Sequence, residues 1–184
     1  PEDRAALFVG DLQDWPQFLK GGLNRRFLQL LGPSGCGKTT RLRALQDRFP
    51  DSAGLSWCPE EGWPPLPASS EGPLLVDDAQ ELSGWLLAGV LQFRAVAVAT
   101  QRDLSDRFAR AGFEIRNVKI QELVTVGQLQ KVVERRLEWA RRGPGALPLI
   151  GKDVISGLFR NYGPDLESIQ SDLYDHYQQL ETEE

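Results

Sequence analysis

The sequence predicts an α/β fold in which helices flank a parallel sheet, followed by a small all-helical subdomain. Up to about residue 124, short apolar runs alternate with helical patterns, and this alternation is typical of parallel strands joined by helical crossovers. A glycine-rich turn also separates the first apolar run from its helix. Beyond residue 124 only amphipathic helical patterns follow. We therefore expect an α/β domain over 1–124, a helical subdomain over 125–180 and an acidic tail over 181–184.

The amino-terminal elements follow from apolar spacing. Leu12, Trp15 and Leu19 recur on one side of a helical pattern that two glycines end. Short apolar runs then predict buried strands on either side of a segment that is expected to be helical. The expected elements are helix 11–19, strand 26–31, helix 40–49 and strand 54–58.

A loop over 59–72 interrupts the alternation, because its prolines and glycines exclude a regular helix or an interior strand. Beyond it the apolar runs are short, as central parallel strands should be. The expected elements are strand 73–78, helix 80–92, strand 94–100, helix 104–111 and strand 115–120.

Three helices are expected in the carboxy-terminal part, over 126–142, 152–162 and 164–180. The first of them is basic. Its cations are Lys131, Arg135, Arg136, Arg141 and Arg142. Because Glu134 and Glu138 lie among these cations, the pattern favours a solvated, salt-bridged face over a nucleic-acid contact.

Composition narrows the class of protein. A formal net charge of −5 argues against a dedicated nucleic-acid binder, although a local basic face stays open. No apolar run approaches the roughly 20 residues that span a membrane. A disulfide between the two cysteines, Cys36 and Cys58, would deform the glycine-rich turn, so we expect free thiols and a cytoplasmic location. The single histidine, His176, offers no metal cluster.

The glycine-rich turn fits the pattern G-x-x-x-x-G-K-[ST] over Gly32–Thr39 and leads from a strand into a helix. Glycines let backbone N–H groups face phosphate oxygens, Lys38 can reach the β- and γ-phosphates, and the Thr39 hydroxyl can bind Mg²⁺. The sequence therefore predicts a nucleotide-phosphate site. The residues expected to contact the nucleotide are Gly32, Pro33, Ser34, Gly35, Cys36, Gly37, Lys38, Thr39 and Thr40.

Two carboxylates, Asp77 and Asp78, end the strand predicted over 73–78. Ligands of open parallel sheets bind at the carboxyl ends of strands, so both residues are catalytic candidates. We expect Asp77 to hold Mg²⁺ together with Thr39, and Asp78 to orient or deprotonate an attacking water. The alternative is that the pair merely ends a strand and caps the next helix.

Three further polar residues are candidates for the same chemistry. Thr100 ends strand 94–100, where its hydroxyl could bind the attacking water or the γ-phosphate, or could simply end the strand. Arg107 and Arg110 share one face of the following helix. Either could reach the γ-phosphate of a neighbouring subunit, and a solvated surface is the alternative.

Taken in order, these segments resemble the AAA+ ATPase family. Gly32–Thr39 resembles its Walker A motif, Leu74–Asp78 its Walker B motif, and Thr100 its sensor 1. The arginine-containing helix 104–111 and a three-helix lid add to the likeness. The resemblance implies ATP and Mg²⁺ as cofactors, with Lys38, Asp77, Asp78, Thr100, Arg107 and Arg110 as catalytic residues. It also implies a homo-oligomer that acts on a protein partner.

The segment Asp78-Ala79-Gln80 adds a fainter similarity, to the Asp-Glu-Ala-Gln of transposition-regulator and secretion-type AAA+ ATPases. Two positions depart from the family pattern. Asp78 stands where the family has Glu, and Glu167 stands near the slot of a phosphate-sensing Arg, for which Arg160 is a weak substitute. An ATP-gated switch or scaffold with little hydrolysis is therefore the alternative function.

Other nucleotide-binding classes fit less well. Thr100-Gln101-Arg102-Asp103 is close to the guanine-reading [NT]-K-x-D of GTPases, but Gln101 replaces the lysine. ABC transporter ATPases have a signature loop before the Walker B strand, whereas Leu82-Ser83-Gly84 follows it here. A small-molecule kinase would need an arginine-rich lid loop, and none stands out.

Overall fold

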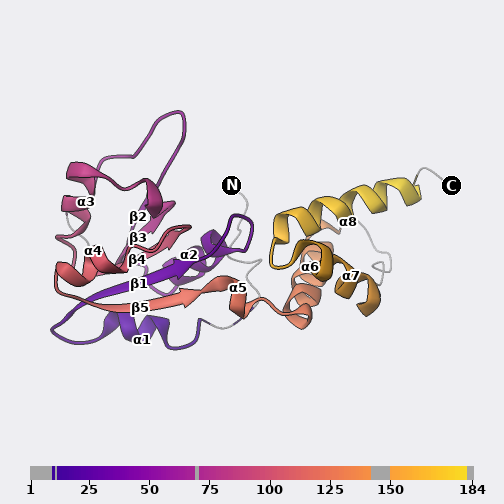
Figure 1. The fold of residues 1–184 in the computed structure, drawn as a ribbon, viewed down its shortest axis with the longest axis horizontal. Coiled ribbons are helices and arrows are strands. Elements are labelled where there is room, and N and C mark those ends of the chain that lie inside the picture. Colours follow the sequence, from indigo (N-terminus) through magenta and orange to yellow (C-terminus); the bar gives the residue numbers. More distant parts are fainter. Residues whose placement is uncertain (1–9, 11, 69–70, 142–149, 182–184) are drawn as a thin grey trace.

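The computed structural model describes residues 10, 12–68, 71–141 and 150–181 (Figure 1). Its centre is one five-stranded sheet with the order β2-β3-β4-β1-β5, and every neighbouring pair of strands is parallel. The strands are β1 (Arg25–Leu31), β2 (Ala53–Ser56), β3 (Leu74–Asp77), β4 (Ala95–Thr100) and β5 (Phe113–Lys119). The parallel α/β architecture predicted from the sequence is confirmed.

Helices cover both faces of the sheet, because successive side chains of a strand point to opposite faces. On β1, Phe27 packs in one core cluster with residues of α3 and α4, while Leu28 packs in another with residues of α1 and α2. The helices of this part are α1 (Trp15–Lys20), α2 (Lys38–Gln46), α3 (Gly84–Val90), α4 (Ser105–Arg110) and α5 (Ile120–Leu123). The sheet is thus buried on both sides.

Strand order determines which loops meet at the carboxyl edge of the sheet. Strand β4 lies between β1 and β3, with Leu31 at the end of β1 paired in register with Thr100 at the end of β4. The turn after β1, the end of β4 and Asp77 at the end of β3 therefore lie along one edge.

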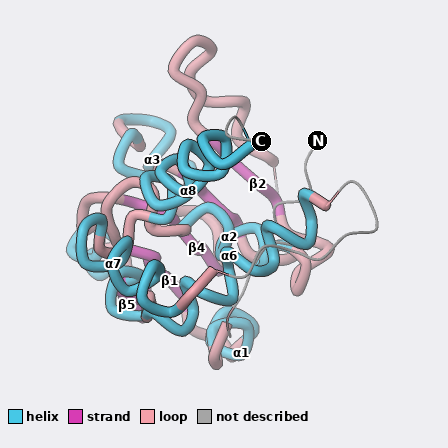
Figure 2. The backbone as a smooth tube through the Cα atoms, turned by 90° about the vertical axis from the view of Figure 1, so that its right-hand side faces the viewer, coloured by secondary structure: helices cyan, strands magenta, loops and turns pink. Residues whose placement is uncertain are grey.

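The carboxy-terminal helices have a core of their own and lie beyond the carboxyl ends of the strands (Figures 1 and 2). They are α6 (Val126–Ala140), α7 (Lys152–Tyr162) and α8 (Leu166–Glu181). Leu129, Ile155 and Ile169, one from each helix, are almost fully buried together. Their position places them against the edge at which the glycine-rich turn and the Asp pair lie.

Two element predictions need correction, and one short helix is additional. The helix expected over 80–92 is a 3-10 turn (Ala79–Glu81) followed by α3, because Leu82 is extended and Gly84 has φ +52°. The first helix begins at Trp15 rather than at residue 11, since Gln13 has φ +51°. The short helix α5 was not predicted.

The remaining boundaries shift by a few residues. Residue 142 of the predicted basic helix, and residues 182–184 of the predicted tail, lie outside the described residues. The described part of the 59–72 loop contains no helix. In the described part of the chain, no helix is both long and apolar enough to cross a membrane. Cys36 and Cys58 are both free thiols.

Candidate functional site

The turn over Gly32–Thr39 joins β1 to α2 through two left-handed glycines. Gly35 has φ +77° and Gly37 has φ +84°, backbone conformations that side chains with a Cβ rarely adopt. Lys38 is the first residue of α2 and only 8% exposed, and its Nζ donates to the Pro33 carbonyl at 2.6 Å. The ammonium group is therefore folded over the turn at the amino end of a helix, where the helix dipole favours an anion.

Thr39 and Asp77 meet across two separate elements. The Thr39 hydroxyl donates to Asp77 Oδ1 at 3.2 Å, and that oxygen also accepts from the Asp78 N–H at 3.1 Å. Burial raises the pKa of Asp77, against the opposing effect of the Thr39 hydrogen bond. A hydroxyl and a desolvated carboxylate side by side suit a small hard cation that takes its other ligands from phosphate and water. In the described residues, no group of three or more acidic, histidine or cysteine side chains could hold a metal unaided.

Asp78 follows Asp77 but lies in a different environment. Its backbone is left-handed, with φ +54°, and it lines a cavity beside Lys38 and Thr39. Asp78 Oδ1 accepts from Gln80 Nε2 at 3.0 Å, and Gln80 Oε1 accepts from the Gln101 N–H at 3.1 Å. A non-glycine residue in this conformation carries strain, which concentrates at functional sites. Gln80 thus ties the Asp78 carboxylate to the end of β4.

Thr100 does not face the cavity. It is fully buried, and its hydroxyl donates to the Arg102 carbonyl at 2.9 Å and accepts from the Arg102 N–H at 3.1 Å. The next residue, Gln101, lines the cavity instead. Sequence reasoning missed Gln101 because a strand-end hydroxyl can turn back onto its own backbone, and the local sequence gives no sign of that turn.

The cavity has a volume of about 500 Å³, within the usual range for small-molecule sites. One wall is the glycine-rich turn with Asp78 and Gln101. The other wall comes from the carboxy-terminal helices: Arg136 and Trp139 on α6, and Leu166, Glu167 and Gln170 on α8. The space therefore lies between the sheet edge and the carboxy-terminal helices.

Helix α8 touches the turn directly. The Leu166 N–H donates to the Gly35 carbonyl at 3.1 Å, and a Cβ at Gly35 would lie 2.1 Å from Asp165 Oδ1. Asp165 in turn accepts from the backbone N–H groups of Glu167 and Ser168, both at 3.1 Å. The glycine at position 35 thus permits a close approach of α8 as well as a left-handed turn.

The charged residues that the carboxy-terminal helices place at the cavity differ in part from those predicted. Glu167 does line it, as its place at the start of α8 suggests, but the proposed substitute Arg160 does not. Among the described residues of the carboxy-terminal helices, Arg136 on α6 is instead the cation that lines the cavity. It belongs to the basic pattern noted in the sequence, but its orientation depends on how α6 packs.

The two arginines considered for action in trans, Arg107 and Arg110, are exposed on α4 and do not line the cavity. Helix α4 packs against β5 and the same face of the sheet as α3. Their predicted role therefore requires a second subunit.

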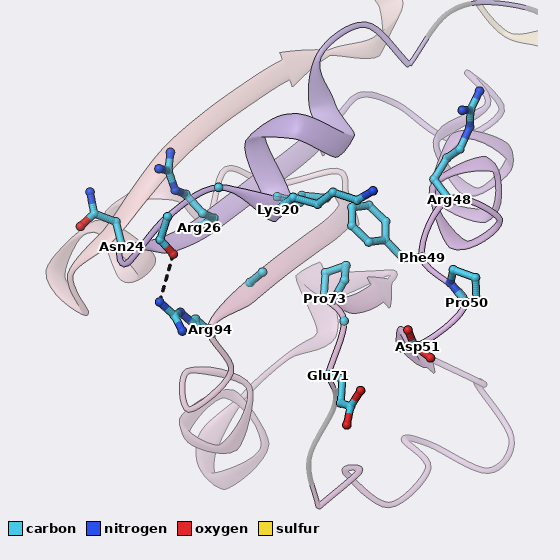
Figure 3. A pocket seen from close by; sticks show the side chains of 15 residues that line it. Lys20, Asn24, Arg26, Arg48, Phe49, Pro50, Asp51, Glu71, Pro73 and Arg94 are labelled. Carbon is cyan, nitrogen blue, oxygen red and sulfur yellow. Dashed lines mark hydrogen bonds between the residues drawn. The ribbon is translucent and has the colours of Figure 1, made fainter.

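A second cavity, of about 490 Å³, lies at the amino ends of the strands (Figure 3). Lys20, Arg26 and Arg94 are among the residues that line it. Arg26 pairs with Glu114 at 2.6 Å, and Arg94 donates to the Gly22 carbonyl at 3.0 Å. Because none of the predicted site residues lines this cavity, the space beside Lys38 is the candidate functional site.

Comparison of the chain with protein-family models, and with curated proteins, gave no match.

Proposed function

We propose that the chain is a Mg²⁺-dependent, ATP-binding ATPase of the AAA+ type that couples nucleotide binding and hydrolysis to assembly or remodelling of a partner. The observation that supports it best is the contact between Thr39 Oγ1 and Asp77 Oδ1 at 3.2 Å. Two motif residues that lie far apart in the sequence meet there, at the amino end of α2 and beside a cavity of about 500 Å³.

Phosphate binding follows from the turn and from Lys38. The N–H groups at the start of α2 offer donors to phosphate oxygens, and the helix dipole adds to the attraction. The Lys38 ammonium, which donates to Pro33, is within reach of the same space and would exchange that carbonyl for phosphate oxygens.

Thr39 and Asp77 are the residues that would hold Mg²⁺. When bound, the ion neutralises charge on the β- and γ-phosphates. The burial that raises the pKa of Asp77 also makes its ionised carboxylate a stronger partner for a cation, because little water competes for it.

Asp78 is proposed as the residue that orients or deprotonates the attacking water. The hydrogen bond from Gln80 leaves Asp78 Oδ2 available for that water, and the link from Gln80 to Gln101 positions the carboxylate. Asp is one methylene shorter than the Glu of the family, so hydrolysis is expected to be slow. The second candidate function is accordingly an ATP-gated switch that hydrolyses little.

ATP is favoured over GTP by the surroundings of Asp103, the residue that would read guanine. Its Oδ1 accepts from Gln29 Nε2 at 2.9 Å and from the Ser105 N–H at 2.8 Å. Hydrogen bonds from the Ser105 hydroxyl first, then from Gln29 and the Ser105 N–H, lower the pKa of Asp103 and hold it as a structural carboxylate at the start of α4.

The carboxy-terminal helices are proposed as a lid over the nucleotide. Arg136 and Trp139 would face the bound nucleotide from α6, and Glu167 from α8. If Arg107 or Arg110 stabilises the γ-phosphate bound to a neighbouring subunit, the active form is a homo-oligomer. A protein partner is part of the same proposal.

Steady-state ATP turnover tests this proposal. We expect turnover that requires Mg²⁺ and is lost in Lys38→Ala. The control is Arg48→Ala, which removes an exposed cation near the end of α2. Equal turnover in the parent and Lys38→Ala would refute it. The ATP-gated switch is favoured instead if the parent binds MgATP but hydrolyses almost none of it, and if Asp78→Glu strongly raises the rate of hydrolysis.

A further inference from the structure

Arg41 is a buried cation one turn into α2, directly behind the glycine-rich turn. It is only 7% exposed, unlike Arg43 and Arg48, which are exposed. Its Nη1 donates to the Cys36 carbonyl at 3.3 Å and to the Gly37 carbonyl at 3.1 Å. A single guanidinium nitrogen therefore holds two successive carbonyls of the turn.

Because of the geometry of the peptide group, these hydrogen bonds also determine the direction of the neighbouring N–H groups. A trans peptide is planar, and its C=O and the following N–H point in opposite directions. Fixing the carbonyls of Cys36 and Gly37 toward Arg41 therefore fixes the N–H groups of Gly37 and Lys38 on the opposite side. Gly37 and Lys38 are residues that line the cavity, whereas Arg41 does not.

A third peptide group of the turn is held in the same manner. The Gly35 carbonyl accepts from the Leu166 N–H at 3.1 Å, which fixes the orientation of the Cys36 N–H. Three consecutive carbonyls thus have donors supplied by the protein, and the Arg41 guanidinium serves two of them. The Gly37 carbonyl also accepts from the Arg41 backbone N–H at 3.3 Å, whereas the guanidinium is the donor to the Cys36 carbonyl. The absence of a side chain at Gly37 leaves room for the guanidinium, because a Cβ at that position would lie 2.9 Å from Arg41 Nη1.

We propose that Arg41 is a positioning residue for the nucleotide-phosphate site: it holds the turn so that the N–H groups of Gly37 and Lys38 face bound phosphate. This inference rests on the proposed function for the identity of the ligand. The effect of Arg41 on the conformation of the turn does not depend on that function. Preorganised donors bind an anion more tightly than mobile ones, because the loss of conformational freedom precedes binding.

The test compares Arg41→Met, which keeps the apolar stem and removes the donors, with Arg48→Met, which removes an exposed cation near the end of the same helix. Backbone amide order parameters of residues 36–38 are measured by NMR in the nucleotide-free protein. MgATP and pyrophosphate affinities are measured by titration calorimetry. We expect the order parameters of the Gly37 and Lys38 amides to fall from a rigid value of about 0.85 in the parent to below about 0.6 in Arg41→Met, while that of Cys36, which the Leu166 contact orients, changes little.

In Arg41→Met, the loss of two charge-assisted hydrogen bonds should lower the affinities for MgATP and for pyrophosphate by about ten-fold or more. Arg48→Met should stay within about two-fold, since rim charges on an exposed surface contribute little. Arg41→Lys, a single donor group without the guanidinium fork, should lie between parent and Arg41→Met in both measurements. It also serves if Arg41→Met does not fold.

The two proposals fail in distinguishable ways. If the parent binds neither ligand, the nucleotide function is wrong, and the order parameters alone decide the role of Arg41. If the Gly37 and Lys38 amides stay as rigid in Arg41→Met as in the parent, the inference is overturned even if affinity falls, because Arg41 would then act only through its charge. Equal weakening by Arg48→Met overturns it as well.

Discussion

At the scale of single residues, neighbouring carboxylates have separate surroundings. Asp77 is half-buried and hydrogen-bonded to Thr39, whereas Asp78 turns through a left-handed backbone to line the cavity with Gln80 as its partner. The sequence alone predicted both as site residues, because paired carboxylates at the end of a buried strand favour that position. The two carboxylates have different environments because Asp78 has a positive φ, which no sequence pattern indicated.

Replacing Asp77 by Asn should stabilise the metal-free protein at pH 7 while removing Mg²⁺-dependent nucleotide binding. The folded-state pKa of Asp77 is raised above 3.8 by burial, so its ionised form costs stability at pH values above the folded pKa. The gain in melting temperature of Asp77→Asn should therefore vanish as the pH falls below 3.8, where Asp77 is protonated in both states. Melting curves of the parent and Asp77→Asn, recorded from pH 7 to below pH 3.8, test this expectation. A lower melting temperature of Asp77→Asn at pH 7 would contradict it.

Asp78→Asn should bind MgATP as the parent does but hydrolyse it at least about 100-fold more slowly, because a general base is lost while the cavity is conserved. Single-turnover measurements with saturating ATP separate the chemical step from binding. Glu81→Gln, on the exposed end of the same 3-10 turn, is the matched control. An unchanged rate in Asp78→Asn would remove Asp78 from the mechanism.

Some residues of the candidate site were beyond prediction from the sequence. Thr100 was considered as a ligand of water or phosphate, yet its hydroxyl hydrogen-bonds to Arg102. Gln101 and Arg136 line the cavity. Local turns and the packing of separate helices decide such contacts, whereas the glycine-rich turn has its own pattern and could be predicted.

At the scale of elements, the start of α8 is the junction between the two parts of the chain. Asp165 caps the helix, and Leu166 hydrogen-bonds to the glycine-rich turn. Apolar periodicity predicted the helix within two residues at its start. The helix predicted over 80–92 was wrong because the apolar spacing continues across the break at Leu82, where tertiary packing and Gly84 impose an extended bend.

Asp165→Ala should destabilise the carboxy-terminal helices by about 1 kcal/mol, the usual cost of removing a cap. Hydrogen bonds, from the Ser168 hydroxyl above all, lower the pKa of Asp165, so its contribution is present above pH 3.8 and is lost as the pH falls through the lower folded pKa. Denaturant unfolding at pH 7 measures the loss. Ser171→Ala, exposed on the same helix, is the control, and equal stability of the two variants would contradict the capping role.

At the scale of the whole molecule, the parallel sheet and the cluster of three helices lie beside each other (Figure 1). Residues from both parts line the candidate site. The alternation of strands and helices predicted the sheet, and the loss of strands after residue 124 predicted the helices. The walls of the cavity could not be predicted, because they depend on how α6 and α8 approach the sheet edge.

Mixing two inactive variants should restore ATP turnover if an arginine acts across subunits. Lys38→Ala would supply the intact Arg107 and Arg110, and a variant lacking one of these arginines would supply the intact glycine-rich turn. Because both arginines are exposed away from the cavity of their own chain, any contribution must come in trans. No recovery in mixtures with either Arg107→Ala or Arg110→Ala would exclude that arrangement.

The central claim, that the glycine-rich turn holds the phosphates of a nucleotide, is tested most directly by calorimetric titration of MgATP into the parent and Lys38→Ala. We predict one binding site per chain in the parent and an affinity at least about ten-fold lower in Lys38→Ala, from the loss of a charge-assisted contact. Equal affinity in the two proteins, or no binding to the parent, would contradict the account.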